Sequence, residues 1–397
     1  MFVSPNLRYL RDSAARIPLA YVSMTVRYFL VGVVLLGAWW TSGLFFGEVV
    51  VVEIVRVPDG GRMPRAVIDE ADTVHLVYFE GVMSGGELLY VTRDIGDSEW
   101  TEPTWVNSEP RSVVGVGPID GGQLTLDANA RLHIVWFQTN PTRVFYTRST
   151  DDRHGFEPQR TLWSEEDGSF EASPTVTTDD KGNVFVFWHA GGAEDADRAV
   201  HMMMSHDGGN NFGAVRRVSK DGEGACGCCN MAAFADSAGT VYVSYRGAGE
   251  NVRRGQRLLT SGDAGHTLAD ESIHGWQIGA CPVTTTTLSE GPSGVRVAWE
   301  TDGQVYFAPA DRLDNVVSPE GEIRFRRKNP VVAVNTKGDT LLAWGDGPGL
   351  RAGGALHWQL FDANGQPIQE RGDEATVPSG SAPTAVVRAD DSFLLLF

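Results

Sequence analysis

The sequence predicts an all-β protein built as a β-propeller of seven blades, with six blades as the alternative. The first observation is a short strand with an aromatic end that recurs along the chain, with ends at Tyr78, Trp136, Trp188, Tyr245, Trp299, Trp344 and Phe397. Successive ends lie between 45 residues (344 − 299) and 58 residues (136 − 78) apart, which is typical of similar units that bury their apolar faces against one another. The second observation is a polar turn with Asp or Gly before most copies, which predicts a hairpin at the start of each unit.

The segment before the repeat is predicted to anchor the protein in a membrane. Residues 28–47 carry no charge over 20 positions, a length that crosses the hydrocarbon core of a bilayer. Four arginines precede this stretch, and the next basic residue after it is Arg56. The positive-inside rule therefore predicts a cytoplasmic segment at 1–27, an uncleaved signal anchor at 28–47 and an extracytoplasmic (periplasmic or extracellular) propeller at 48–397. A cleaved signal peptide is the alternative, which the long segment before the apolar stretch disfavours.

Each complete unit is predicted to contain four strands. In the third unit the expected strands are 174–178, 184–188, 199–204 and 214–218. Six such units run from about Pro64 to about Pro378, and the seventh contains only the strands 383–388 and 393–397. Because a half blade would leave an open edge, we expect residues 49–57 to close the ring by pairing with the C-terminal strands.

A turn signature follows the third strand of several units. Residues 205–212 and 261–268 both read Ser-x-Asp-x-Gly-x-x-apolar, and looser versions occur at 92–100 and 149–156. In such a turn the Asp accepts backbone N–H bonds and the Gly takes a positive φ, while the apolar residue fills the gap between neighbouring strands.

Over residues 60–397 the chain resembles the sialidase (neuraminidase) superfamily, whose Asp-box (BNR) repeats have this form and this place in each blade. It is also similar to uncharacterised bacterial members of that superfamily with a comparable Cys-x-Cys-Cys loop. The resemblance implies a sialidase-like β-propeller, and the box indicates the fold rather than the activity.

Strand order places two groups of loops on one rim of the ring, and the resemblance implies that the active site lies there. Ends of second strands bring Glu80, His189, Arg246 and Glu300 to this rim, and the loops before first strands bring Arg62, Arg111 and Arg327. Arg62-Met63-Pro64 is similar to the sialidase motif whose arginine holds the sialic acid carboxylate, a role that suits the planar guanidinium. The other arginines and His189 are the further candidates for substrate binding.

Glu80 and Glu300 are the carboxylates best placed for acid–base catalysis, which would need a raised pKa on one of them. Sialidases similar to this chain use a tyrosine nucleophile late in the sequence, and no Tyr follows Tyr306 here. If the protein is an enzyme, an exo-sialidase-like glycoside hydrolase is the expected class, but this absence argues against sialidase chemistry itself.

The cysteines form a second candidate site on the same rim. All four, Cys226, Cys228, Cys229 and Cys281, fall in the loops before the fourth and fifth blades, which are neighbours in space. One interpretation is a disulfide from Cys281 to a member of the cluster, as is common in an oxidising compartment. The other is a soft-metal site for Cu(I) or Zn(II), although C-x-C-C is not a common zinc spacing and adjacent cysteines rarely ligate one ion without strain.

The net charge of −18 excludes nucleic acid as an expected partner, because phosphate binding needs a basic face. The first functional hypothesis is therefore a membrane-anchored, extracytoplasmic propeller that binds or hydrolyses a glycan. The second is a non-hydrolytic propeller with a cysteine-based metal or redox site, and the third is an interaction scaffold.

Overall fold

The computed structural model describes residues 50–151, 154–165, 171–347 and 352–397. The predicted cytoplasmic segment 1–27 and the predicted transmembrane segment 28–47 lie outside these residues. Within the described part of the chain, none of the helices has the length and apolar character needed to cross a bilayer.

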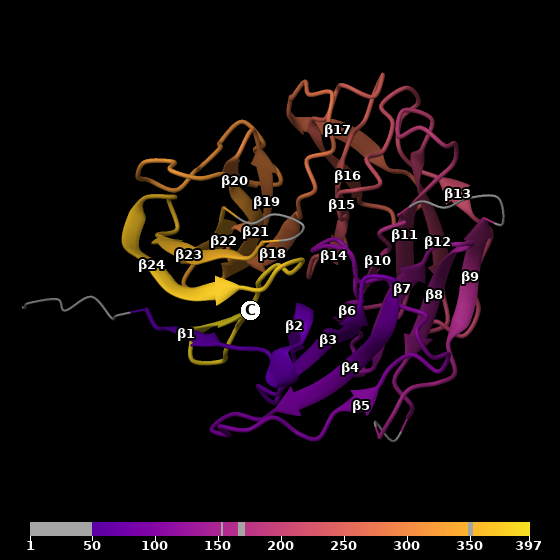
Figure 1. Ribbon diagram of the computed structural model, residues 1–397, viewed down its shortest axis with the longest axis horizontal. Helices are drawn as coiled ribbons and strands as arrows, with labels where there is room; N and C mark the ends of the chain where they lie inside the picture. Colours follow the sequence, from indigo (N-terminus) through magenta and orange to yellow (C-terminus); the bar gives the residue numbers. More distant parts are fainter. Residues whose placement is uncertain (1–49, 152–153, 166–170, 348–351) are drawn as a thin grey trace, which may run out of the picture. The chain divides into compact units, whose positions relative to one another are not determined.

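Seven β-sheets are arranged around a central axis (Figure 1), which confirms the seven-bladed propeller. Blades 1 to 3 consist of β2 (Arg62–Ile68), β3 (Val74–Val82), β4 (Gly85–Arg93) and β5 (Thr104–Trp105); β6 (Gln123–Leu126), β7 (Leu132–Gln138), β8 (Thr142–Arg148) and β9 (Arg160–Glu165); and β10 (Thr175–Thr178), β11 (Val184–Ala190), β12 (Ala199–Ser205) and β13 (Arg216–Arg217). Blades 4 to 6 consist of β14 (Ala232–Ala235), β15 (Val241–Arg246), β16 (Gln256–Ser261) and β17 (Ala269–His274); β18 (Thr287–Gly291), β19 (Gly294–Thr301) and β20 (Gln304–Pro309); and β21 (Arg327–Val334), β22 (Thr340–Asp346), β23 (Gly354–Phe361) and β24 (Pro367–Val377). Blade 7 consists of β1 (Val52–Val55), β26 (Phe393–Leu396) and β25 (Thr384–Val387), and a short 3₁₀ helix, η1 (Pro58–Gly60), links β1 to blade 1.

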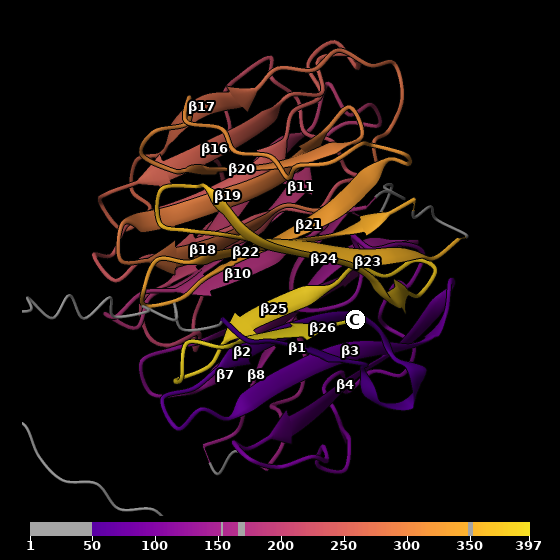
Figure 2. The ribbon, with the colours of Figure 1, turned by 90° about the vertical axis from the view of Figure 1, so that its left-hand side faces the viewer.

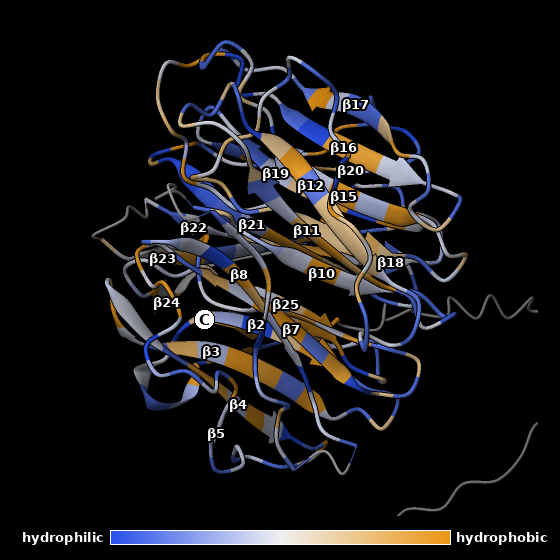
Figure 3. Cartoon of the chain, turned by 90° about the vertical axis from the view of Figure 1, so that its right-hand side faces the viewer, coloured by the Kyte–Doolittle hydropathy of each residue, from blue (hydrophilic) through white to orange (hydrophobic). Residues whose placement is uncertain are grey.

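The first strand of every blade lies innermost, next to the first strands of the two neighbouring blades, so the ring is closed. The second strand is the recurring aromatic-ended segment of the sequence, and it is buried on both faces; Trp136, Trp188, Trp299 and Trp344 are among the largest fully buried side chains. Hydrophobic residues follow the strands, and hydrophilic residues gather in the loops at their ends (Figure 3). Because the second strand is buried on both faces, its sequence is a continuous apolar run rather than an alternation of apolar and polar residues.

Blade 7 closes the ring as the sequence predicted. β1 pairs in parallel with β26, with Val52 opposite Phe393 and Val55 opposite Leu396. β25 pairs with the other side of β26 in the antiparallel direction, and the three strands lie side by side in Figure 2. The last blade is therefore built from both ends of the propeller.

The turns at 205–212 and 261–268 lie on the rim opposite the ends of the second strands. In the first turn Asp207 Oδ1 accepts the N–H of Asn211 at 2.8 Å, and Ser205 Oγ accepts the N–H of Gly209 at 2.9 Å. Gly209 has φ 78°, and a Cβ there would lie 1.9 Å from Tyr146 Oη, so only glycine fits. Phe212 packs edge-on against Tyr146 of blade 2 with ring centroids 4.9 Å apart, which joins neighbouring blades.

Candidate functional site

The two predicted catalytic carboxylates lie on different blades and in different environments. Glu80 is exposed near the end of β3, opposite Glu87. Glu300, on β19, is 0% exposed, and burial is the main cause that raises its pKa. Its Oε1 accepts the N–H of Gly303 at 2.7 Å, and among the described residues its Oε2 has no hydrogen-bond partner. No contact between described residues joins the two carboxylates.

Arg62 and Arg111 both lie against the β3–β4 hairpin of blade 1. The Arg62 guanidinium stands over the Phe79 ring at 5.3 Å and donates from Nη2 to the Gly81 carbonyl at 3.3 Å. Arg111 is exposed and donates from Nη2 to Ser84 Oγ at 3.4 Å. The sequence placed Arg111 at the start of blade 2, but β6 begins only at Gln123, so the residues that lead into this blade are later ones.

Arg246, by contrast, is buried in the protein interior. It is 1% exposed, and it donates from Nη1 to the Arg254 carbonyl at 2.7 Å and from Nη2 to the Glu300 carbonyl. Its guanidinium also stacks over the Trp276 ring at 5.5 Å. The structure thus brings two predicted site residues, Arg246 and Glu300, together, but the arginine binds the backbone of its neighbour.

Arg327 also donates hydrogen bonds to backbone carbonyls. Its Nη1 donates to the Pro319 carbonyl and its Nη2 to the Glu320 carbonyl, both at 3.1 Å. The guanidinium also lies over the Trp344 ring at 5.1 Å. These bonds satisfy the carbonyls of the loop that leads into β21, so the arginine fixes that loop.

His189, at the end of β11, is fully buried. Neither ring nitrogen has a hydrogen-bond partner among the described residues. Burial lowers the pKa of His189 to about 4, because desolvation disfavours the charged imidazolium. The imidazole is therefore neutral at physiological pH.

Asp120 is a rim residue that the sequence analysis missed. It precedes β6 in a glycine-rich loop and is 1% exposed. Its Oδ2 accepts the N–H groups of Val116 and Gly117 at 2.7 and 2.8 Å. Burial outweighs these bonds and raises the pKa of Asp120 to about 7. The available signal was an acidic residue in the turn-forming stretch Gly-Pro-Ile-Asp-Gly-Gly at 117–122, just before β6 begins at Gln123.

The raised pKa of Asp120 predicts a pH-dependent stability. An unfolded chain releases this proton near pH 3.8, whereas the folded protein retains it up to about pH 7. The stability that the protonated group contributes is therefore complete below pH 3.8 and is lost as the pH rises towards 7. Asp120→Asn should leave stability nearly unchanged at pH 4 and raise it by roughly 1–3 kcal/mol at pH 8. Urea unfolding at both pH values measures the difference.

The exposed Asp311 gives a matched control for this measurement. Asp311→Asn should change stability equally little at pH 4 and at pH 8. If Asp120→Asn shows no greater gain at pH 8 than at pH 4, the side chain of Asp120 is ionised in the folded protein and the prediction is wrong.

The four cysteines come together on the same rim. Cys226 Sγ lies 3.2 Å from Cys228 Sγ and 3.7 Å from Cys229 Sγ. Ligand atoms of Cys226, Cys281 and Asp195 also lie within 4.8 Å of one another. All four are free thiols, so the disulfide expected as the alternative is not formed in this structure.

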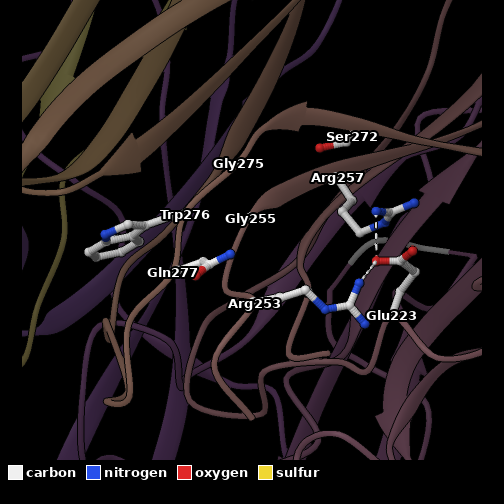
Figure 4. Close-up of a pocket in the computed structure, with 9 residues that line it drawn as sticks. Glu223, Arg253, Gly255, Arg257, Ser272, Gly275, Trp276 and Gln277 are labelled. Carbon is white, nitrogen blue, oxygen red and sulfur yellow. Dashed lines mark hydrogen bonds and ion pairs between the residues drawn. The ribbon is translucent and has the colours of Figure 1, made fainter. Parts of the chain in front are cut away.

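A pocket of about 410 Å³ opens on blade 4 (Figure 4). Trp276 lies on one side of it and the ion pair of Glu223 and Arg257 on the other. This pair has an N–O distance of 2.9 Å, and Glu223 is 4.0 Å from Arg253. The remaining lining residues are Gly247, Gly255, Ser272, Gly275 and Gln277.

Comparison with known proteins identifies the fold and no family. The sequence matches no protein-family model and no curated protein. A solved protein of unknown function from Dyadobacter fermentans has a TM-score of 0.53 and 14% identity, over 78% of this chain and 96% of its own. An α-L-arabinanase from Penicillium chrysogenum, solved with arabinobiose, has a TM-score of 0.52 and 12% identity, over 77% of this chain and 94% of its own. An α-L-arabinofuranosidase from Fusarium graminearum has a TM-score of 0.52 and 10% identity, over 76% and 93%.

At these identities the likeness shows the β-propeller fold alone. Membership of the sialidase superfamily stays a prediction from the turn signature.

Proposed function

We propose that the protein binds a neutral saccharide in the blade 4 pocket, on the extracytoplasmic side of a membrane to which residues 28–47 anchor it. The observation that carries the proposal is the chemistry of the pocket wall. Trp276 offers an aromatic surface, Gln277 an amide, Ser272 a hydroxyl, and Glu223 with Arg253 charged acceptors and donors. Such a mixture of one apolar plane and convergent polar groups suits the hydroxyl-rich faces of a sugar.

Three features favour an uncharged ligand over the acidic sugar that a sialidase would bind. The arginines of the pocket are already paired: Arg257 bonds Glu223 and Asp270, and Arg253 lies 3.6 Å from Glu250. Two of the further arginines predicted to bind substrate, Arg246 and Arg327, are buried and donate to backbone carbonyls. A net charge of −18 also repels anionic polymers.

The structural neighbours are consistent with this proposal, since two of them are named for their action on arabinose-containing glycans and one was solved with arabinobiose. The volume of about 410 Å³ lies within the usual range for small-molecule sites, about 300–1,000 Å³.

Removal of the indole should weaken saccharide binding. We expect Trp276→Ala to lower the affinity for a bound oligosaccharide by roughly tenfold, because aromatic contacts contribute about 0.5–1.5 kcal/mol beyond their area. Isothermal titration calorimetry against neutral oligosaccharides, including arabinobiose, and against sialyllactose measures both affinity and the preference for uncharged sugars.

Trp105→Ala is the matched control, because Trp105 is 61% exposed on the outer strand of blade 1, far from the pocket in the sheet order. This variant should bind as the unchanged protein does. Preference for sialyllactose, or equal binding by both tryptophan variants, would contradict the proposed site.

A further inference from the structure

We propose that Cys226, Cys228, Cys229 and Cys281 bind one soft metal ion, Cu(I) or Zn(II), on the rim at the start of blades 4 and 5. This site is separate from the saccharide pocket and does not depend on it. Soft thiolate ligands favour both ions over harder metals. The proposal depends on four observations: the positions of the sulfur atoms, the loop that holds them, the charges around them and the access from solvent.

The sulfur positions suit a thiolate-bound metal ion. A tetrahedral metal with M–S bonds of about 2.3 Å places its sulfur ligands about 3.8 Å apart. Cys226 and Cys229 are already 3.7 Å apart, and the three sulfur atoms of the C-x-C-C loop all lie within 4.8 Å of one another. A disulfide would require about 2.05 Å, whereas Cys226 and Cys228 are 3.2 Å apart.

A tight turn brings the sulfur atoms of Cys226, Cys228 and Cys229 to one side of their loop. The C-x-C-C spacing therefore does not prevent these cysteines from ligating one ion. The Cys229 N–H donates to the Cys226 carbonyl at 3.2 Å, and the Cys226 N–H donates to the Arg246 carbonyl at 2.9 Å. At Gly227, between them, a Cβ would lie 2.4 Å from Arg198 Nη1. A larger residue here would displace the Arg198 guanidinium, so glycine lets the turn pack closely against blade 3.

Positive charges around the cluster would balance a thiolate complex. Asp195 holds Arg198 and Arg254 in ion pairs with N–O distances of 2.5 Å. Arg254 is close enough to interact electrostatically with Cys226 and Cys281, and Arg246 acts in the same way on Cys229. A metal ion with four thiolates is a net anion, so these guanidinium groups offset its burial.

Asp195 itself is not the expected ligand. One of its carboxylate oxygens lies within 4.8 Å of Cys226 and Cys281, but both oxygens already accept bonds from arginines. Its role is to orient the guanidinium groups of Arg198 and Arg254 next to the cysteine ligands.

The cluster is open to solvent at one side. Cys226 and Cys229 are buried, Cys228 is half-buried and Cys281 is exposed. An ion can therefore enter past Cys281 and displace the thiol protons as it binds.

Metal analysis of the full-length protein tests the proposal. The reduced protein, stripped with a chelator under anaerobic conditions, is offered Zn(II) in one arm and Cu(I) in the other, each against a chromophoric competitor. We expect one ion per chain in at least one arm, a thiolate-to-metal charge-transfer band, and protection of the four thiols from alkylation. The tighter arm identifies the metal.

Two cysteine variants and one control make the test specific. Cys229→Ser and Cys281→Ser should each weaken metal binding at least 100-fold, because a hydroxyl is a poor ligand for a soft ion. Cys281→Ser changes an exposed side chain and should keep the thermal melt, so its loss of metal cannot be attributed to unfolding. Val252→Ala, at a 40% exposed side chain in the loop between β15 and β16, should bind the metal normally.

Three results would overturn the proposal. One is the absence of bound metal in both arms with four reactive thiols. Another is a protein isolated without reductant that contains disulfides and still binds no metal after reduction. The third is full affinity in Cys281→Ser, which would exclude the four-thiolate site.

Discussion

Deletion of residues 383–397 should abolish folding of the entire propeller rather than loosen one blade. The deletion removes β25 and β26 and leaves β1 without a partner. On β26, Phe393 and Leu395 pack in the core shared with blade 6, whereas Leu394 and Leu396 pack in the core shared with blade 1. Burial of four such side chains contributes about 6–12 kcal/mol, which is comparable to the whole stability of a typical domain, about 5–15 kcal/mol.

Circular dichroism and thermal melting of the deleted protein measure this outcome, and loss of the cooperative transition is expected. Ile368→Ser provides a control in the same region, because Ile368 is 50% exposed on β24 and its replacement should leave the melt unchanged. A cooperative melt at the original temperature after the deletion would show that the ring does not need its seventh blade.

Arg246→Ala should destabilise the protein by about 3–5 kcal/mol, since removal of one partner from a buried charged network leaves the other groups uncompensated. The substitution would remove the hydrogen bonds that the Arg246 guanidinium donates to the Arg254 and Glu300 carbonyls. It would also remove the positive charge that acts on the buried Glu300. Urea unfolding at neutral pH measures the loss as a lower transition midpoint.

Arg253→Ala tests whether the effect belongs to the buried arginine. Arg253 belongs to the same blade, but its side chain is 42% exposed and its ion pairs are 3.6 and 4.0 Å long. Exposed pairs of this kind contribute about 0–1 kcal/mol. Equal losses in the two variants would mean that Arg246 is not the structural residue inferred here.

The blade count and the ring closure could be predicted because both depend on burial. The second strands pack on both faces, so each needs a long apolar run, and its aromatic end is conspicuous in the sequence. The partner of β26 could be inferred because an open half blade would be unstable. The outer strands were harder to place: β5 and β13 have only two residues each, and blade 5 has three strands. Outer strands bury little, so their sequences are weakly constrained.

The sequence predicted which residues share the rim, but not which contacts their side chains make. Strand order alone was sufficient to bring Arg246 and Glu300 to the same rim. Whether an arginine faces solvent or a backbone carbonyl depends on the path of the neighbouring loops, which a repeat does not encode. Asp120 was missed for the same reason, because its burial arises from the long loop before β6 rather than from any strand.

The parallel pairing of β1 with β26 gives the propeller a mechanical property. The chain passes into this pair at Val52, opposite Phe393, and leaves it at Leu396, opposite Val55. Tension applied to the chain on either side of the domain would therefore pull the two strands past each other along their length. All rungs of the ladder would bear the load at once, instead of opening one after another as in a hairpin pulled from its ends. Blade 7 would thus resist tension on the chain in shear.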